Sequence, residues 1–211
     1  MPHIAARAAL TLALTTLALT GCRVESSKQG NGDNVKVATP FGGVQIKTDN
    51  AAVAEGIGLP IYPGATPIIK KKDDGKHDDN GAADINMSFG SFKLRVKAAS
   101  YHSDDPQDKI VAFYRPALAK YGDIIQCDHD RPIGNPTHTS QGLTCDKDSK
   151  NNHISSTSSD SKIEFKAGSE QHQHIVEVDP DGAGTKIGLV VLDLPTHFSL
   201  GDNSSNDDDK Q

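Results

Sequence analysis

Cys22 is the residue whose type and position most directly predict a chemical modification. It follows residues 19–21 (Leu-Thr-Gly) and ends an apolar run of 13 residues that begins at Ala8, just after Arg7. The run is shorter than the roughly 20 residues of a membrane-spanning helix, and its layout is that of an export signal. We therefore expect cleavage before Cys22, a thioether-linked diacylglycerol on its sulfur, and a fatty acyl group such as palmitate on the new amino terminus. The alternative is an ordinary cleaved signal peptide in which Cys22 has no role.

Cys127 and Cys145 are expected to form a disulfide. The chain has three cysteines, and lipid attachment would use one of them, which leaves these two for each other. Disulfides persist outside the cytoplasm, and closing a loop of this size is worth about 3 kcal/mol. A reactive thiol is the alternative, but residues 128–130 (Asp-His-Asp) beside Cys127 are mixed in charge and do not resemble the cationic surroundings that activate a thiol.

His172 and His174 are the histidines that lie closest together in the chain after the signal segment. On a strand they would share one face, about 7 Å apart, and could bind one metal ion with a third ligand such as Glu164 or Glu170. The alternative is a solvated strand end, because apolar residues begin only at Ile175. We favour the solvated histidines and assign no metal site and no cofactor.

Motifs of the common enzyme classes are absent from the sequence. It contains no G-x-S-x-G, no H-E-x-x-H, no P-loop and no G-x-G-x-x-G. The glycine-bearing acidic segments around Gly81 and Gly182 lack carboxylates at the positions that an EF-hand calcium loop requires. With a net charge of −6 and no basic stripe, the composition argues against a nucleic-acid partner. We expect no enzymatic activity.

Four segments are predicted along the chain. Residues 1–21 form the lipoprotein signal peptide, residues 22–33 a polar flexible tether, residues 34–200 a single domain, and residues 201–211 a disordered acidic tail. The domain is large enough for one core, but only 35% of the residues are apolar. The core is therefore expected to be modest.

Two β-hairpins are predicted in the first half of the domain. Alternating apolar residues at 35–37 and 44–46 flank a Pro-Phe-Gly-Gly turn and indicate an N-terminal hairpin. From Ile85 to Val96 the apolar residues change from odd to even positions across Gly90-Ser91, which a two-residue turn explains. Phe89 then faces Phe92, and Ile85 faces Val96. A type II turn is expected at Pro63-Gly64.

A long amphipathic helix is predicted over residues 106–121. Asp105 is a suitable N-cap and Pro106 fits the first helical position. The apolar stripe comprises Ile110, Phe113, Tyr114, Ala117, Leu118 and Tyr121. Gly122 is expected to end the helix, and Pro116 to kink it.

Further strands are expected near residues 124–127, 143–145, 162–166, 172–178 and 186–194. The predicted fold class is α+β: an antiparallel β-sheet with one long amphipathic helix (about 106–121) packed on a face and an extra N-terminal hairpin. The charged segments 70–84 and 146–161 are expected to be exposed loops and, with the sheet edges, the main contact surfaces.

Several short motifs follow one another along the chain in an order that resembles a known group of proteins. They are Tyr62-Pro-Gly-Ala65, Ser103-Asp-Asp105, Ala112-Phe-Tyr-Arg115, Tyr121-Gly122, Gln126-Cys127 and Gly184-Thr185. In this order they resemble uncharacterised lipoproteins of Gram-negative bacteria, over residues 35–195. The resemblance implies the hairpin–helix–strand fold and an envelope location, and it transfers no site residue. Pro116 departs from the pattern, which has an ordinary helix former there.

The sequence therefore predicts a lipid-anchored protein of the cell envelope that acts as a non-catalytic binding or interaction module. Its partners would be the membrane, through Cys22, and an envelope protein. The alternatives are a periplasmic lipoprotein that binds a metal or small ligand and, less favoured, a hydrolase. Arg23 after the cysteine differs from the aspartate that retains some lipoproteins in the inner membrane, so we expect the outer membrane, facing the periplasm or the cell surface.

Overall fold

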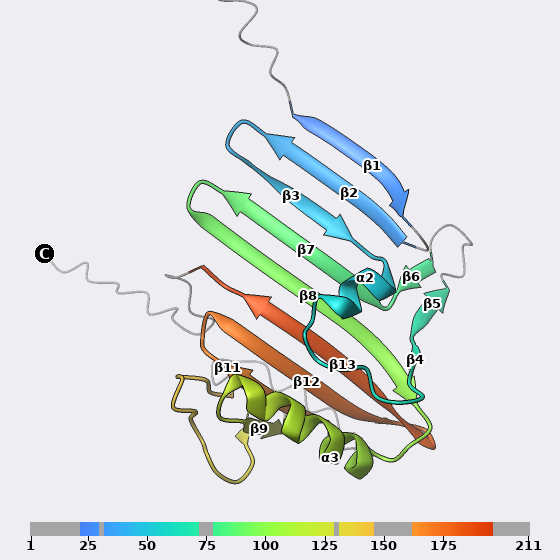
Figure 1. Ribbon diagram of the computed structural model, residues 1–211, viewed down its shortest axis with the longest axis vertical. Coiled ribbons are helices and arrows are strands. Elements are labelled where there is room, and N and C mark those ends of the chain that lie inside the picture. The colour runs from blue at the N-terminus through green and yellow to red at the C-terminus, as the bar shows by residue number, and fades with distance from the viewer. Residues whose placement is uncertain (1–21, 30–31, 72–77, 129–130, 146–161, 196–211) are drawn as a thin grey trace, which may run out of the picture.

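A single antiparallel sheet dominates the computed structural model, which describes residues 22–29, 32–71, 78–128, 131–145 and 162–195 (Figure 1). Its strands, in spatial order, are β1 (Arg23–Gln29), β2 (Gly32–Thr39), β3 (Gly42–Lys47), β7 (Ala82–Phe89), β8 (Phe92–Ser103), β13 (Gly184–Asp193), β12 (His172–Asp181), β11 (Ile163–Gly168), β9 (Ile125–Asp128) and β10 (Arg131–Pro132). The short β4 (Thr66–Pro67) pairs with β8, and β5 (Ile69–Lys71) with β6 (Asp78–Asn80). The predicted signal peptide (residues 1–21), the predicted loop at 146–161 and the predicted tail at 201–211 lie outside the described residues.

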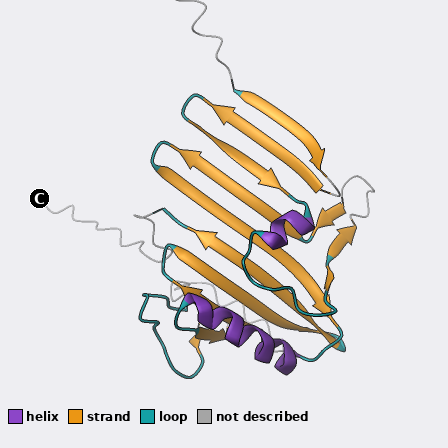
Figure 2. Ribbon diagram, viewed as in Figure 1, coloured by secondary structure: helices purple, strands orange, loops and turns teal. Residues whose placement is uncertain are grey.

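The predicted α+β fold with a long amphipathic helix is wrong. The described chain is mostly β-sheet, and its helical content is small: α2 (Asn50–Glu55) and one segment made of α3 (Gln107–Leu118) and a 3-10 turn (Ala119–Tyr121). Both helices lie on the same face of the sheet, α2 against β7 and β8 and α3 against β12 and β13 (Figure 2). The predicted N-terminal hairpin is present as β2 and β3, but it is part of the main sheet.

Local interactions explain why α3 is shorter than predicted. The Asp105 side chain does not cap the helix, because it accepts hydrogen bonds from Lys109 Nζ (2.7 Å) and the Tyr62 hydroxyl (2.8 Å); Pro106 is the N-cap. The helix interior contains Pro116, which lies on the exposed side and has no amide hydrogen to donate. After Leu118 the chain tightens into the 3-10 turn, and Gly122 has φ 134, outside the left-handed helical region.

The β7–β8 hairpin has the predicted register. Phe89 pairs with Phe92, Met87 with Leu94 and Ile85 with Val96. Gly90 has φ 59, the positive value that the first central position of this turn requires. The sequence prediction is confirmed here because side-chain alternation and turn chemistry point to the same register.

The predicted flexible tether is replaced by a strand. Residues Arg23–Gln29 form β1, which pairs with β2 along its whole length, from Arg23 opposite Ala38 to Gln29 opposite Gly32. Its polar side chains give no apolar alternation, so the backbone ladder that holds this edge strand leaves no signal in the sequence. Residues 143–145, predicted as a strand, are not assigned to one.

The hydrophobic core lies between the two helices and the C-terminal half of the sheet. α3 contributes Ile110, Tyr114 and Leu118, each fully buried. The Tyr114 hydroxyl accepts a hydrogen bond from the Tyr62 amide (3.1 Å), so the type II turn that follows, with Gly64 at φ 79, is tied to the helix. On β8 the odd-numbered residues, such as Ala99 and Tyr101, face the helices. The even-numbered residues of β8 therefore lie on the opposite face of the sheet.

Candidate functional site

Cys22 lies at the start of the edge strand. Its side chain is exposed, and β1 begins at the next residue, Arg23. No spacer therefore separates the predicted lipid attachment site from the folded sheet. A group carried by the Cys22 sulfur would lie within a few ångströms of the sheet edge, because one residue of extended chain spans roughly 3.5 Å.

A line of polar side chains crosses six adjacent strands on the face that carries the helices. Successive cross-strand pairs define this polar row, which comprises Lys36, Gln45, Asn86, Arg95, Asp193 and His172. These residues come from β2, β3, β7, β8, β13 and β12. No stretch of sequence brings them together, so the row could not be found by inspecting motifs.

The polar row lines an open cleft of about 790 Å³. Beside it run Ala38, Gly43 and Ser88, whose small side chains leave room above the sheet, and Lys93 completes that second line. Lys36, Lys93 and Arg95 outnumber the one acidic lining residue, Asp193, although the chain as a whole is acidic. Such a lining suits a ligand or a protein segment that presents carboxylate or phosphate groups.

His172 and His174 share this face, as expected of residues two apart on a strand, but they have different neighbours. His172 Nδ1 lies 2.9 Å from Asp193 Oδ1 at the rim of the cleft. The His174 ring stacks on Tyr121, with ring centroids 3.5 Å apart, and its buried Nδ1 has no hydrogen-bond partner among the described residues. Burial lowers the His174 pKa, and the positive charge that His172 can carry adds to this, while Asp193 opposes it.

The described ranges contain no cluster of three histidine, cysteine, aspartate or glutamate side chains that could hold a metal ion. Glu164, one of the two third ligands considered, lies 3.2 Å from Lys166 Nζ. Glu170 lies beside Gly142. On this face His172 contacts Asp193 and His174 stacks on Tyr121.

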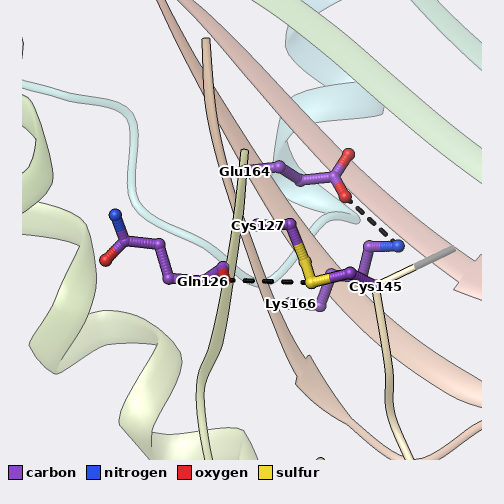
Figure 3. Close-up of a disulfide and its surroundings, with 5 residues drawn as sticks. All are labelled: Gln126, Cys127, Cys145, Glu164 and Lys166. Carbon is purple, nitrogen blue, oxygen red and sulfur yellow. Dashed lines mark hydrogen bonds and ion pairs between the residues drawn. A yellow bond between two sulfur atoms is a disulfide. The ribbon is translucent and has the colours of Figure 1, made fainter. Parts of the chain in front are cut away.

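The predicted disulfide between Cys127 and Cys145 is confirmed. Figure 3 shows the bond beside the Gln126 backbone, whose carbonyl oxygen lies 3.8 Å from Cys145 Sγ. Both cysteines are buried with Ile125 and Leu143 in a small cluster separate from the main core. The bond thus fixes segment 143–145 to β9, and its surroundings indicate a structural role.

A line of apolar side chains crosses the sheet on the face opposite the helices. Cross-strand pairs define this apolar row, which comprises Val24, Val37, Val44, Met87 and Leu94. Val24 is 66% exposed. The apolar row begins on β1, two residues after Cys22. The alternation of apolar residues within each strand is visible in the sequence, but which of them line up across the sheet is known only from the strand register.

The chain matches no protein-family model, no curated protein and no solved structure. Among the helices in the described ranges, none has the length and apolar character needed to cross a bilayer.

Proposed function

We propose that this protein is a lipid-anchored binding module of the bacterial cell envelope, attached to the outer membrane through Cys22. The observation that carries the proposal is the small-residue sequence before Cys22 together with the position of that cysteine, exposed and directly at the edge of the folded sheet. The resemblance of residues 35–195 to lipoproteins of Gram-negative bacteria supports the same location. Several acyl chains on one cysteine hold a protein stably, whereas a single chain binds only marginally.

The cleft above the polar row is the proposed contact surface. Its cationic side chains Lys36, Lys93 and Arg95 favour an envelope partner, or a small ligand, with acidic groups. Lys36 and Lys93 are exposed, so they can meet a partner without unfolding any element. The alternative of a small-ligand binder uses the same cleft and is distinguished by the size of the molecule retained.

Cross-linking in the native host tests the proposal. Cells that produce the wild type, C22A, the double variant K36Q/K93Q or K120Q are cross-linked, and the products are identified by mass spectrometry. Lys120 is an exposed lysine on the 3-10 turn, outside the cleft, so K120Q is the matched control for loss of surface charge.

The proposal expects a discrete product with the wild type and K120Q, and its loss or strong reduction with C22A and K36Q/K93Q. A product that K36Q/K93Q retains in full would overturn the cleft as contact surface. A wild type without any discrete protein or small-molecule adduct would overturn the binding module.

A further inference from the structure

The end of the sheet at which β1 begins carries several exposed apolar side chains. Arg23 pairs with Ala38, so the same register continued by one residue puts Cys22 beside Thr39. Thr39 pairs with Gly42 in the adjacent strand, Gly42 with Phe89, and Phe89 with Phe92. We call this edge, formed by Cys22, the β2–β3 turn, Phe89 and Phe92, the anchor end.

The anchor end is one continuous surface. Figure 1 shows the start of β1 at the same end of the sheet as the β2–β3 and β7–β8 turns. The two turns touch, because the Gly90 amide donates a hydrogen bond to the Phe41 carbonyl oxygen (3.3 Å). With strands about 4.8 Å apart, Phe89 on β7 lies roughly 14 Å from the position of Cys22.

The side chains at this end are unusually exposed for their type. Phe41 is 84% exposed and Phe89 41%, and Val24 on β1 is 66% exposed. Phenylalanine side chains left in water at the tips of neighbouring turns are characteristic of surfaces that enter an apolar environment. Arg23 lies beside them, where a cationic group can meet phosphate headgroups; Glu25, which forms an ion pair with Arg23, is an acidic residue nearby.

We propose that the anchor end rests in the bilayer interface, with Phe41 and Phe89 inserted among the phospholipid acyl chains beside the Cys22 lipid. The inference depends on the proposed lipid anchor and deepens it. β1 begins directly after Cys22, so acyl chains on the Cys22 sulfur would hold this end of the sheet against the membrane. The strands then run away from the bilayer, and Tyr101, nine residues along β8 from Phe92, lies about 30 Å from it.

The absence of tryptophan from the chain provides a direct test. F41W places a single tryptophan at the anchor end, and F89W is a second variant on the adjacent turn. The matched control is I61W, because Ile61 is also exposed (45%) but precedes Tyr62, whose hydroxyl donates a hydrogen bond to Asp105 beside the N-terminal end of α3, far from the anchor end. Each full-length protein is purified with its lipid, reconstituted in phosphatidylethanolamine–phosphatidylglycerol vesicles, and measured with and without brominated acyl chains. The mass of the N-terminal peptide is determined on the same samples.

The expected result is a blue-shifted emission that brominated lipids quench for F41W and F89W, and an emission unaffected by brominated lipids for I61W. Lipidated samples in which F41W and F89W behave as I61W does would overturn the orientation and leave the lipid anchor standing. An unmodified Cys22 in the mass measurement would overturn the anchor, and the orientation with it.

Discussion

The Lys97 ammonium lies 3.3 Å from the Asp84 carboxylate on the helix-bearing face of the sheet, and at most a tenth of either side chain is exposed. The pair joins β7 to β8 where α2 crosses them. Asp84 also accepts a hydrogen bond from the Asn86 amide nitrogen (2.7 Å), and Arg95 Nε lies 3.9 Å away. The arrangement connects the buried pair to the polar row at the cleft.

Removing the carboxylate should therefore destabilise the fold. D84N keeps the shape of the side chain but leaves a buried ammonium without its charged partner, and we expect it to lower the free energy of unfolding by about 3 kcal/mol. Urea denaturation followed by circular dichroism measures this. The exposed Lys93 on β8, the strand that carries Lys97, provides the control: K93M should change stability by less than about 0.5 kcal/mol. Equal effects of D84N and K93M would contradict the role of the buried pair.

Loss of the disulfide should also destabilise the domain. Cys127 and Cys145 are 18 residues apart, and a closed loop of this length restricts the unfolded chain by about 3 kcal/mol. The double variant C127S/C145S is expected to lose an amount of this order in urea denaturation, and the wild type in reductant should lose the same. A disulfide variant as stable as the oxidised wild type would show that segment 143–145 is held by its other contacts.

Stability should fall as the solution becomes more acidic, because burial against Tyr121 lowers the pKa of His174 below its ordinary value of about 6.5. Between the folded-state pKa and 6.5, the unfolded chain binds a proton at His174 that the folded protein does not. The free energy of unfolding therefore decreases as the pH falls through this range. The stability that the neutral His174 contributes is fully present above pH 6.5, and it is lost as the pH falls through the folded-state pKa.

The variant H174F tests this, since it keeps an aromatic ring on Tyr121 and removes the titrating group. The melting temperature of the wild type should drop more steeply between pH 7 and pH 5 than that of H174F. Parallel profiles would show that His174 does not contribute to the acid sensitivity of the fold.

Two glycines with positive φ should differ in their tolerance of alanine. Gly168 (φ 109) ends β11, and a Cβ there would overlap the His172 carbonyl oxygen; Gly182 (φ 63) lies in the β12–β13 turn, and a Cβ there would meet nothing within 4 Å. G182A should cost about 1 kcal/mol, from the left-handed backbone alone. G168A should cost clearly more, because a strand end must move. Chemical denaturation of the two variants compares them, and equal losses would contradict the close approach at Gly168.

Signals from residues close in sequence, together with the cysteine count, predicted one hairpin register, one turn and the disulfide. The β7–β8 register followed from the change of apolar parity across Gly90, and the Tyr62 turn from Pro63-Gly64. The cysteine count led to the pairing of Cys127 with Cys145. Each of these rests on residues close in sequence or on a count that leaves one choice.

Long-range pairing explains what the sequence did not predict. The edge strand β1 is held by a backbone ladder that its polar side chains do not reveal, and the stacking of His174 on Tyr121 joins residues 53 positions apart. The helix was overestimated because the apolar stripe continues through Tyr121, while the backbone tightens into a 3-10 turn after Leu118. The polar row, which forms part of the cleft lining, cannot be identified without the register of six strands.

The state of Cys22 in the native host tests the central claim most directly. The account predicts that the mature N-terminal peptide, isolated from the membrane fraction and analysed by mass spectrometry, begins at Cys22 and carries a diacylglyceryl group and an amide-linked acyl chain, and that C22A leaves that fraction. A mature chain that keeps residues 1–21, or that begins with an unmodified Cys22, would contradict it.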